Sequence, residues 1–326
     1  MPDKIQKKSA FVAVVGRPSV GKSTLINLLC GAKVSIVSPV PQTTRNSIRG
    51  IVNRERGQIV FVDTPGRHNS EKKLNRKLIE TADRVQNDAD LILYMLDATR
   101  LPQTEEEICA ASLPANMLKE KIIVAVNKID NKLATKAAMD AIETFLENTF
   151  EKPHIFKISA LKKDGVEEML NAIFDLCPVG EPYYDTDCYT DQDVRFRISE
   201  IVREKATERL REEIPHSIYV EVADCELHGS VEEIKIPAAE PQSISVLPDS
   251  CTTARIQTLD IRAFIRCERE SQKGMIVGKG GKMIRSIRLA ALKELKEIFD
   301  WNIKLDLRVK TASDWRHNDS VLKKLF

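Results

Sequence analysis

Residues 16–23 read G-R-P-S-V-G-K-S and match G-x-x-x-x-G-K-[S/T], a pattern whose residue types suit phosphate binding. Glycines let backbone N–H groups approach phosphate oxygens, a lysine neutralises phosphate charge, and a serine hydroxyl can bind Mg²⁺. The apolar run 10–15 predicts a buried strand before the loop, and residues 24–29 predict the start of a helix after it. Strand, loop and helix form the context that this motif requires, so we favour a nucleotide site over a chance glycine turn.

A D-x-x-G sequence at residues 63–66 supplies the second part of the predicted site. It follows the apolar run 58–62, which predicts another strand. A carboxylate at the end of a strand can hold Mg²⁺ through water, and a glycine N–H can reach the γ-phosphate. Such a turn is common and is weak evidence alone. Its position after a phosphate loop and a strand favours a nucleotide site. Across both motifs, the predicted nucleotide contacts are Gly16, Arg17, Pro18, Ser19, Val20, Gly21, Lys22, Ser23, Thr24, Asp63, Thr64, Pro65 and Gly66.

The N-K-I-D sequence at residues 127–130 predicts which base is bound. The Asp130 carboxylate only accepts hydrogen bonds, so it suits the N1–H and 2-amino groups of guanine, whereas adenine offers neither donor. A site of this kind can reject the wrong base by roughly 10⁴-fold or more. The stem of Lys128 can lie over the base, and the Asn127 amide can bridge to the phosphate loop. In isolation the same residues would indicate only a turn. The last predicted base contact, to the guanine O6, comes from the backbone of Ser159, Ala160 and Leu161.

Hydrolysis of a bound nucleoside triphosphate needs a threonine that reaches Mg²⁺ only when the γ-phosphate is present. The P-Q-T-T-R sequence at residues 41–45 offers Thr44, with Thr43 as the second choice. Water would attack the γ-phosphate in line while Mg²⁺ and protein groups stabilise the developing charge. For that role we predict Lys22, Thr44 and the Gly66 amide. For the metal ligands we predict Ser23, Thr44 and Asp63.

The predicted strands place these motifs at one edge of a sheet. Apolar runs at 10–15, 58–62, 91–96, 122–126 and 155–158 alternate with helical segments. This alternation predicts an α/β P-loop fold, with a mostly parallel sheet and helices on both faces. Ligands of such sheets bind at the carboxyl ends of the strands, where all the motifs fall.

Composition limits the class of protein. A chain of 326 residues with 42% apolar residues predicts two soluble domains. No apolar run approaches the roughly 20 residues of a membrane span. Seven cysteines without a C-x-x-C pair predict reduced thiols in a cytosolic protein, and Mg²⁺ with nucleotide is the only metal expected. Residues 271–326 carry 13 Lys and Arg against 6 Asp and Glu, which hints at a polyanionic partner although a solvated helix face could explain it.

A second domain is predicted after a segment without periodicity. The expected division is a GTPase domain over residues 1–178, a linker over 179–192 and a second domain over 193–326. In this second domain, helical spacing at 196–213 ends before Pro215. Strands are predicted at 217–222, 260–267 and 303–309. A helix is predicted from 282 to about 299.

The second domain has its own glycine loop, G-K-G-G at residues 278–281, between two helical segments. Small residues let such a loop press against a nucleic-acid backbone, and the nearby cations supply charge. KH domains clamp about four nucleotides of single-stranded RNA in this way, and the element order predicts an α+β KH domain of type II. A glycine loop alone could be only a tight turn. The predicted RNA contacts are Gly278, Lys279, Gly280, Gly281, Lys282 and Arg285.

These motifs together resemble the bacterial Era family, and the resemblance covers nearly the whole chain. Local runs at 203–205, 210–215, 268–274 and 314–316 agree with it. The resemblance implies a cytoplasmic GTPase that uses Mg²⁺ with GTP, binds the 3′ end of 16S ribosomal RNA, and acts in small ribosomal subunit assembly. We expect a monomer. Peripheral inner-membrane association is also reported for the family, but nothing in the sequence favours it.

The sequence departs from the family pattern in three places. Ser19 stands where the family usually has an asparagine that helps to hold a monovalent cation, and Arg67 follows Gly66 where the family has an apolar residue. Residues 229–257 exceed the usual spacing and predict a loop insertion. Two alternatives stay open beside the leading interpretation. One is a GTPase whose second domain binds protein only. The other, an RNA-binding protein with a degenerate nucleotide site, is disfavoured by the intact Lys22, Ser23 and Asp130.

Overall fold

The computed structural model describes residues 6–38, 46–64, 73–114, 119–231 and 255–325. The chain divides into two compact units, the first formed by residues 1–193 and 313–326 and the second by residues 194–312. Both the predicted linker and the C-terminal residues thus group with the first unit. The C-terminal 3₁₀ turn η3 (Trp315–His317) packs against α2 (Lys73–Asp88), and Trp315 is buried, which accounts for this grouping.

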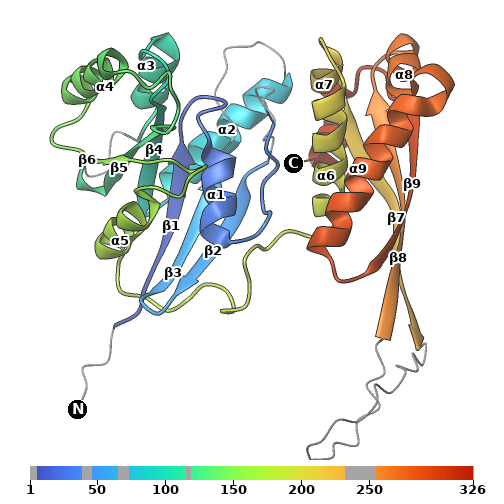
Figure 1. Ribbon diagram of the computed structural model, residues 1–326, viewed down its shortest axis with the longest axis horizontal. Helices are drawn as coiled ribbons and strands as arrows, with labels where there is room; N and C mark the ends of the chain where they lie inside the picture. The colour runs from blue at the N-terminus through green and yellow to red at the C-terminus, as the bar shows by residue number, and fades with distance from the viewer. Residues whose placement is uncertain (1–5, 39–45, 65–72, 115–118, 232–254, 326) are drawn as a thin grey trace, which may run out of the picture. The chain divides into compact units, whose positions relative to one another are not determined.

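A six-stranded sheet forms the centre of the first unit (Figure 1). Its order is β2-β3-β1-β4-β5-β6, with all neighbours parallel except the β2–β3 pair. The strands are β1 (Lys8–Val15), β2 (Ile48–Arg54), β3 (Gly57–Asp63), β4 (Leu91–Asp97), β5 (Ile122–Asn127) and β6 (His154–Lys157). The five predicted strands are present. The edge strand β2 was not predicted, because its arginines, asparagine and glycine break up the apolar run.

Helices cover both faces of this sheet because alternate residues of each strand face opposite sides. On one face the core includes side chains of α1 (Lys22–Cys30) and α5 (Val166–Leu176). On the other face it includes side chains of α3 (Thr104–Ala111) and α4 (Lys136–Thr149). A short 3₁₀ helix, η1 (Lys119–Lys121), precedes β5.

The predicted linker is fixed to the first unit. Gln58 Oε1 accepts hydrogen bonds from the backbone N–H groups of Tyr183 and Tyr184 at 2.8 and 3.0 Å, and its Nε2 donates to the Tyr184 carbonyl at 2.9 Å. The Ile51 N–H of β2 donates to the Tyr189 carbonyl at 2.9 Å. These bonds satisfy the backbone of a segment whose sequence shows no periodicity.

The second unit packs helices on one side of a three-stranded sheet of order β7-β8-β9. Strands β7 (Tyr219–Val231) and β8 (Arg255–Cys267) are antiparallel, and β9 (Asn302–Thr311) runs parallel to β8. The helices are α6 (Val194–Arg209), α7 (Ile214–Ser217), α8 (Glu270–Val277) and α9 (Lys282–Ile298), with the 3₁₀ turn η2 (Lys279–Gly281) between α8 and α9. The chain ends in α10 (Asp319–Leu325), which belongs to the first unit.

Several predicted boundaries in the second unit were wrong. The first helix ends at Arg209 rather than near 213, and Pro215 lies in the first turn of the separate helix α7. Proline is tolerated there because the first N–H groups of a helix have no intrahelical partner. The predicted insertion 229–257 is also too wide, since Gly229 pairs with Gln257 and Val231 with Arg255. Its centre, residues 232–254, lies outside the described residues.

In the part of the chain that the structure describes, no helix is long and apolar enough to cross a membrane.

Candidate nucleotide site and RNA-binding loop

The phosphate loop joins β1 to α1, and close packing requires two of its glycines. Gly16 has φ 153°, and a Cβ there would lie 2.5 Å from the Met95 carbonyl oxygen. Gly21 has φ 106°, and its Cβ would lie 2.3 Å from Nδ2 of Asn127. Any larger residue would therefore push the loop away from β4 or from the N-K-I-D segment.

Lys22 holds its ammonium group inside the loop. Its Nζ donates to the Gly16 and Arg17 carbonyl oxygens at 2.8 and 3.0 Å. Burial lowers the pKa of Lys22, and the nearby Asp63 carboxylate partly offsets that effect. Removing a charge from water strengthens its interaction with an anion brought to the same place.

Ser23 lies at the start of α1 and Asp63 at the end of β3, and their side-chain oxygens are in contact. The Ser23 hydroxyl donates to Oδ2 of Asp63 at 2.7 Å, and the Ser35 hydroxyl donates to the same oxygen at 2.8 Å. Asp63 is fully buried. A hydroxyl and a carboxylate at this spacing form a hard oxygen donor set of the kind that suits Mg²⁺.

Asn127 ties three segments together. Its Nδ2 donates to the Val20 carbonyl at 2.9 Å, and its Oδ1 accepts from the Ala160 N–H at 2.9 Å. The predicted bridge from this amide to the phosphate loop is therefore present. Ala160, expected to face the guanine O6, directs its N–H at Asn127, while the Leu161 side chain is exposed.

Lys128 and Asp130 are each held by a second residue. Lys128 has φ 69°, and its Nζ donates to the Ser19 carbonyl at 2.7 Å and to Oδ2 of Asp97 at 2.6 Å. The buried Ser159 hydroxyl donates to Oδ1 of Asp130 at 2.6 Å. Ser159 thus has a side-chain contact with Asp130, which the sequence did not predict.

Arg17 directs its side chain toward acidic residues on β4 and α3. Its side chain is buried, with one terminal nitrogen 3.2 Å from Asp97 and its Nε 2.7 Å from Glu106 as an ion pair. Its predicted role as a nucleotide contact is therefore limited to its backbone. The sequence signal for Asp97 was an acidic residue at the end of the apolar run 91–96, the same strand end that Asp63 occupies on β3.

The remaining predicted residues divide into two groups. Thr64 is buried, and its hydroxyl donates to the Val14 carbonyl at 2.8 Å; Pro18 lies in the loop and Thr24 on α1. The other group lies outside the described residues: Thr43, Thr44, Pro65, Gly66 and Arg67.

The glycine loop of the second unit spans the end of α8, η2 and the start of α9. Gly278, Gly280 and Gly281 have φ of 71°, 60° and 73°. A Cβ on Gly278 would lie 2.7 Å from Cβ of Met283, whereas a Cβ on Gly280 or Gly281 would meet no atom within 4 Å. This leaves open space in front of the loop. The three predicted cations Lys279, Lys282 and Arg285 are exposed.

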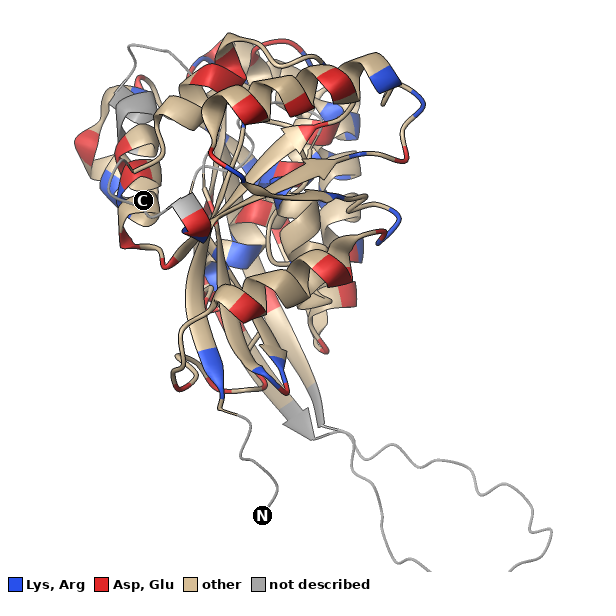
Figure 2. Cartoon of the chain, turned by 90° about the vertical axis from the view of Figure 1, so that its left-hand side faces the viewer, with Lys and Arg blue, Asp and Glu red and all other residues tan. Residues whose placement is uncertain are grey.

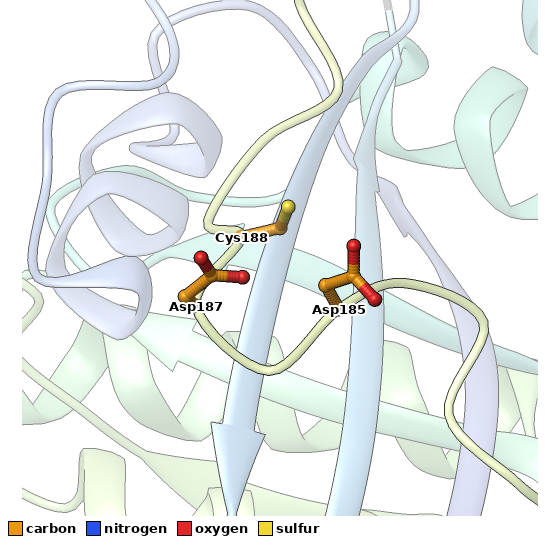
Figure 3. A group of neighbouring side chains, drawn as sticks. All are labelled: Asp185, Asp187 and Cys188. Atoms are coloured by element: carbon orange, nitrogen blue, oxygen red, sulfur yellow. The ribbon is translucent and has the colours of Figure 1, made fainter.

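A third group of polar side chains lies on the segment that follows α5 within the first unit. Asp185, Asp187 and Cys188 face one another (Figure 3), with ligand atoms within 4.8 Å of one another. The two aspartates are exposed, as acidic groups without an ion commonly are, so we assign no metal to them.

Comparisons with known proteins agree with the predictions for both domains of the chain. Residues 11–128 match the family described as 50S ribosome-binding GTPase, and residues 241–316 match the family described as KH domain. The fold and site thus define a GTPase joined to a KH domain, which confirms the predicted fold class. The chain is 44% identical over 319 residues to GTPase Era of Treponema denticola, covering 97% of this chain and 99% of that protein. The chain belongs to the Era family of GTPases, as its motifs predicted.

A second relative and two solved structures agree with this family assignment. GTPase Era of Borreliella burgdorferi is 42% identical, with 98% of this chain and 99% of that protein covered. A crystal structure of Era in complex with MgGDPNP and nucleotides 1506–1542 of 16S ribosomal RNA matches with TM-score 0.84 and 34% identity, over 98% of both chains. A variant of Aquifex aeolicus Era bound to GDP and AlF4⁻ matches with TM-score 0.83 and 34% identity, also over 98% of both.

Proposed function

We propose that this GTPase binds the 3′ end of 16S ribosomal RNA through its second unit and acts in assembly of the small ribosomal subunit. The observation that carries the nucleotide assignment is the meeting of three motifs at the carboxyl ends of β1, β3 and β5. There Ser23 contacts Asp63, and Asn127 contacts the phosphate loop.

We assign one task to each part of the nucleotide site. Loop N–H groups and Lys22 bind the phosphates, and Asp130, oriented by Ser159, accepts from guanine. Ser23 and Asp63 would hold Mg²⁺, which neutralises phosphate charge when bound. For the attack of water on the γ-phosphate, the sequence-based assignments of Thr44 and the Gly66 amide are kept as proposals.

The RNA assignment rests on the glycine loop and on charge. Gly280 and Gly281 leave room for a backbone to approach, beside the exposed Lys279, Lys282 and Arg285. Among the described residues, no ion pair is found for these three cations. The first unit differs, since acidic side chains outnumber basic ones along α4 and α5 (Figure 2). A phosphate backbone is therefore attracted to the second unit rather than to that face.

The relative solved with nucleotides 1506–1542 of 16S ribosomal RNA supports the identity of the RNA. We place the protein in the cytoplasm, where small-subunit assembly occurs. Cell fractionation tests the location. Recovery mainly with the membrane pellet would favour the peripheral association that the family resemblance implies.

Filter binding tests the function. A labelled oligonucleotide of the 16S ribosomal RNA 3′ end is titrated with full-length protein in GDPNP, in GDP and without nucleotide. We expect tight retention that depends on the nucleotide, with a scrambled oligonucleotide as the control. GTP hydrolysis without retention of either oligonucleotide would favour the alternative, a second unit that binds protein only.

A further inference from the structure

Asp97 lies at the end of β4 and connects the phosphate loop to the guanine-selecting segment. Its side chain is 3% exposed. Its Oδ2 accepts from Lys128 Nζ at 2.6 Å and from Arg17 at 3.2 Å. Its Oδ1 accepts from the Thr99 hydroxyl at 2.6 Å and from the Thr99 N–H at 2.9 Å. One buried carboxylate therefore holds side chains from residues 17 and 128, which belong to different motifs.

We propose that Asp97 is a positioning residue that retains guanine nucleotide by fixing the side chain of Lys128. This proposal rests on the assignment of Lys128 to the guanine site made above. Nothing in the N-K-I-D pattern or the phosphate loop identifies Asp97. Its contribution follows from the contacts at the other end of the lysine side chain.

A lysine side chain is flexible unless its ammonium group is held. Ordering a lysine side chain costs much of its rotamer entropy, because the stem has four rotatable bonds. In this structure Asp97 and the Ser19 carbonyl already hold the ammonium group, so the Lys128 side chain is ordered before a base arrives. A side chain ordered in advance makes binding tighter because association no longer has to order it.

The two cations depend on Asp97 to different degrees. Arg17 keeps the buried Glu106 at 2.7 Å and the half-exposed Glu105 at 3.6 Å if Asp97 loses its charge. Among the described residues, Lys128 has no other carboxylate partner and would keep only the Ser19 carbonyl. Loss of the Asp97 charge should therefore act mainly through Lys128.

The Asp97 carboxylate is suited to this task because it stays ionised. Burial alone would raise its pKa, but hydrogen bonds from Lys128 and Thr99 hold the pKa below its usual range. A bond between two charged groups contributes more than a neutral one. The contact is therefore retained throughout the neutral range of pH.

A double-mutant cycle tests the proposal, with dissociation of a fluorescent GDP analogue from the full-length protein as the measurement. We expect Asp97→Asn to accelerate dissociation about tenfold or more, since it removes the negative charge that strengthens the hydrogen bond from the Lys128 ammonium group. Lys128→Met should have a similar effect. In the Lys128→Met background, Asp97→Asn should add less than about twofold. Multiplication of the two single effects would overturn the proposal.

The control is Glu106→Gln, which removes the other buried carboxylate beside Arg17 and leaves Lys128 untouched. Dissociation should change less than about twofold; a change as large as that of Asp97→Asn would assign the effect to Arg17 instead. If Asp97→Asn does not fold, Thr99→Ala removes the hydroxyl hydrogen bond to Oδ1 of the same carboxylate, keeps the backbone one, and should accelerate dissociation severalfold. An unchanged rate in that variant would also overturn the proposal. No effect of Lys128→Met by itself would instead contradict the guanine-site assignment.

Discussion

The Asn127 side chain donates to the Val20 carbonyl at 2.9 Å, which joins the end of β5 to the phosphate loop. The same amide accepts from the Ala160 N–H, and all three groups are buried. One side chain thus holds the phosphate and base segments of the site in register. Loss of the Asn127 side chain should therefore disturb both the phosphate segment and the base segment.

Asn127→Ala should weaken GDP binding by about 10- to 100-fold. The substitution leaves a buried carbonyl and a buried N–H without their partner, at about 1–3 kcal/mol each. Calorimetric titration with GDP measures the effect. Asn171→Ala, on the exposed face of α5, is the matched control and should bind as the unmodified protein does. Equal affinity of the two variants would show that the bridge does not order the site.

Asp130→Asn should exchange GTP specificity for xanthosine triphosphate. The asparagine oxygen can keep accepting from the Ser159 hydroxyl, so its amide nitrogen turns toward the ligand and suits a 2-oxo group. We expect GTP affinity to fall by roughly 10²-fold or more. Competition between GTP, ATP and xanthosine triphosphate measures this. Unmodified protein that binds ATP as well as GTP would refute the base assignment.

Ser19→Asn should introduce potassium activation. Ser19 has φ 63°, a left-handed conformation that asparagine adopts more readily than serine, so the variant should fold at least as stably. In the unmodified protein, Ser19 has no side-chain carbonyl that could hold a monovalent cation. We therefore expect slow GTP hydrolysis, at similar rates in potassium and sodium chloride. Phosphate release in the two salts measures the effect. A several-fold higher rate of the unmodified protein in potassium would contradict this expectation.

Lys279→Asp combined with Gly280→Asp should abolish RNA binding and leave GTP binding intact. Aspartate is among the few residues that tolerate the φ of 60° at position 280, and its Cβ meets no atom within 4 Å, so the second unit should still fold. Filter binding with the 3′-end oligonucleotide measures the loss. Affinity of the unmodified protein should fall with salt, at a log–log slope of roughly −0.7 per phosphate contact.

Lys296→Asp, near the far end of α9, reproduces the charge reversal of Lys279→Asp away from the glycine loop and should weaken binding only slightly. If the double variant binds as tightly as the unmodified protein, the second unit is not an RNA clamp of this kind.

The parts of the fold that could be predicted are those with a local signal. The phosphate loop, the N-K-I-D turn and the five predicted strands of the first unit each show a short pattern of residue types. Contacts between distant residues could not be predicted in this way. Arg17 lies inside a recognised motif, yet its orientation depends on Glu106 on α3. The segment that binds Gln58 looked like a free linker, because its partners lie on β2 and β3.

The length of the β7–β8 ladder bears on how fast the second unit folds. The pair next to the loop, Val231 with Arg255, closes residues 232–254. Strand β8 must also pair with β9. Pairing residues so distant along the chain slows folding, because the loop-closure entropy is lost before the contacts form. Replacing residues 232–254 with a four-residue turn should reduce that loss by about 1.5 kcal/mol. Stopped-flow refolding should then be up to about tenfold faster with RNA retention unchanged, whereas an unchanged rate would mean that the ladder closes after the rate-limiting step.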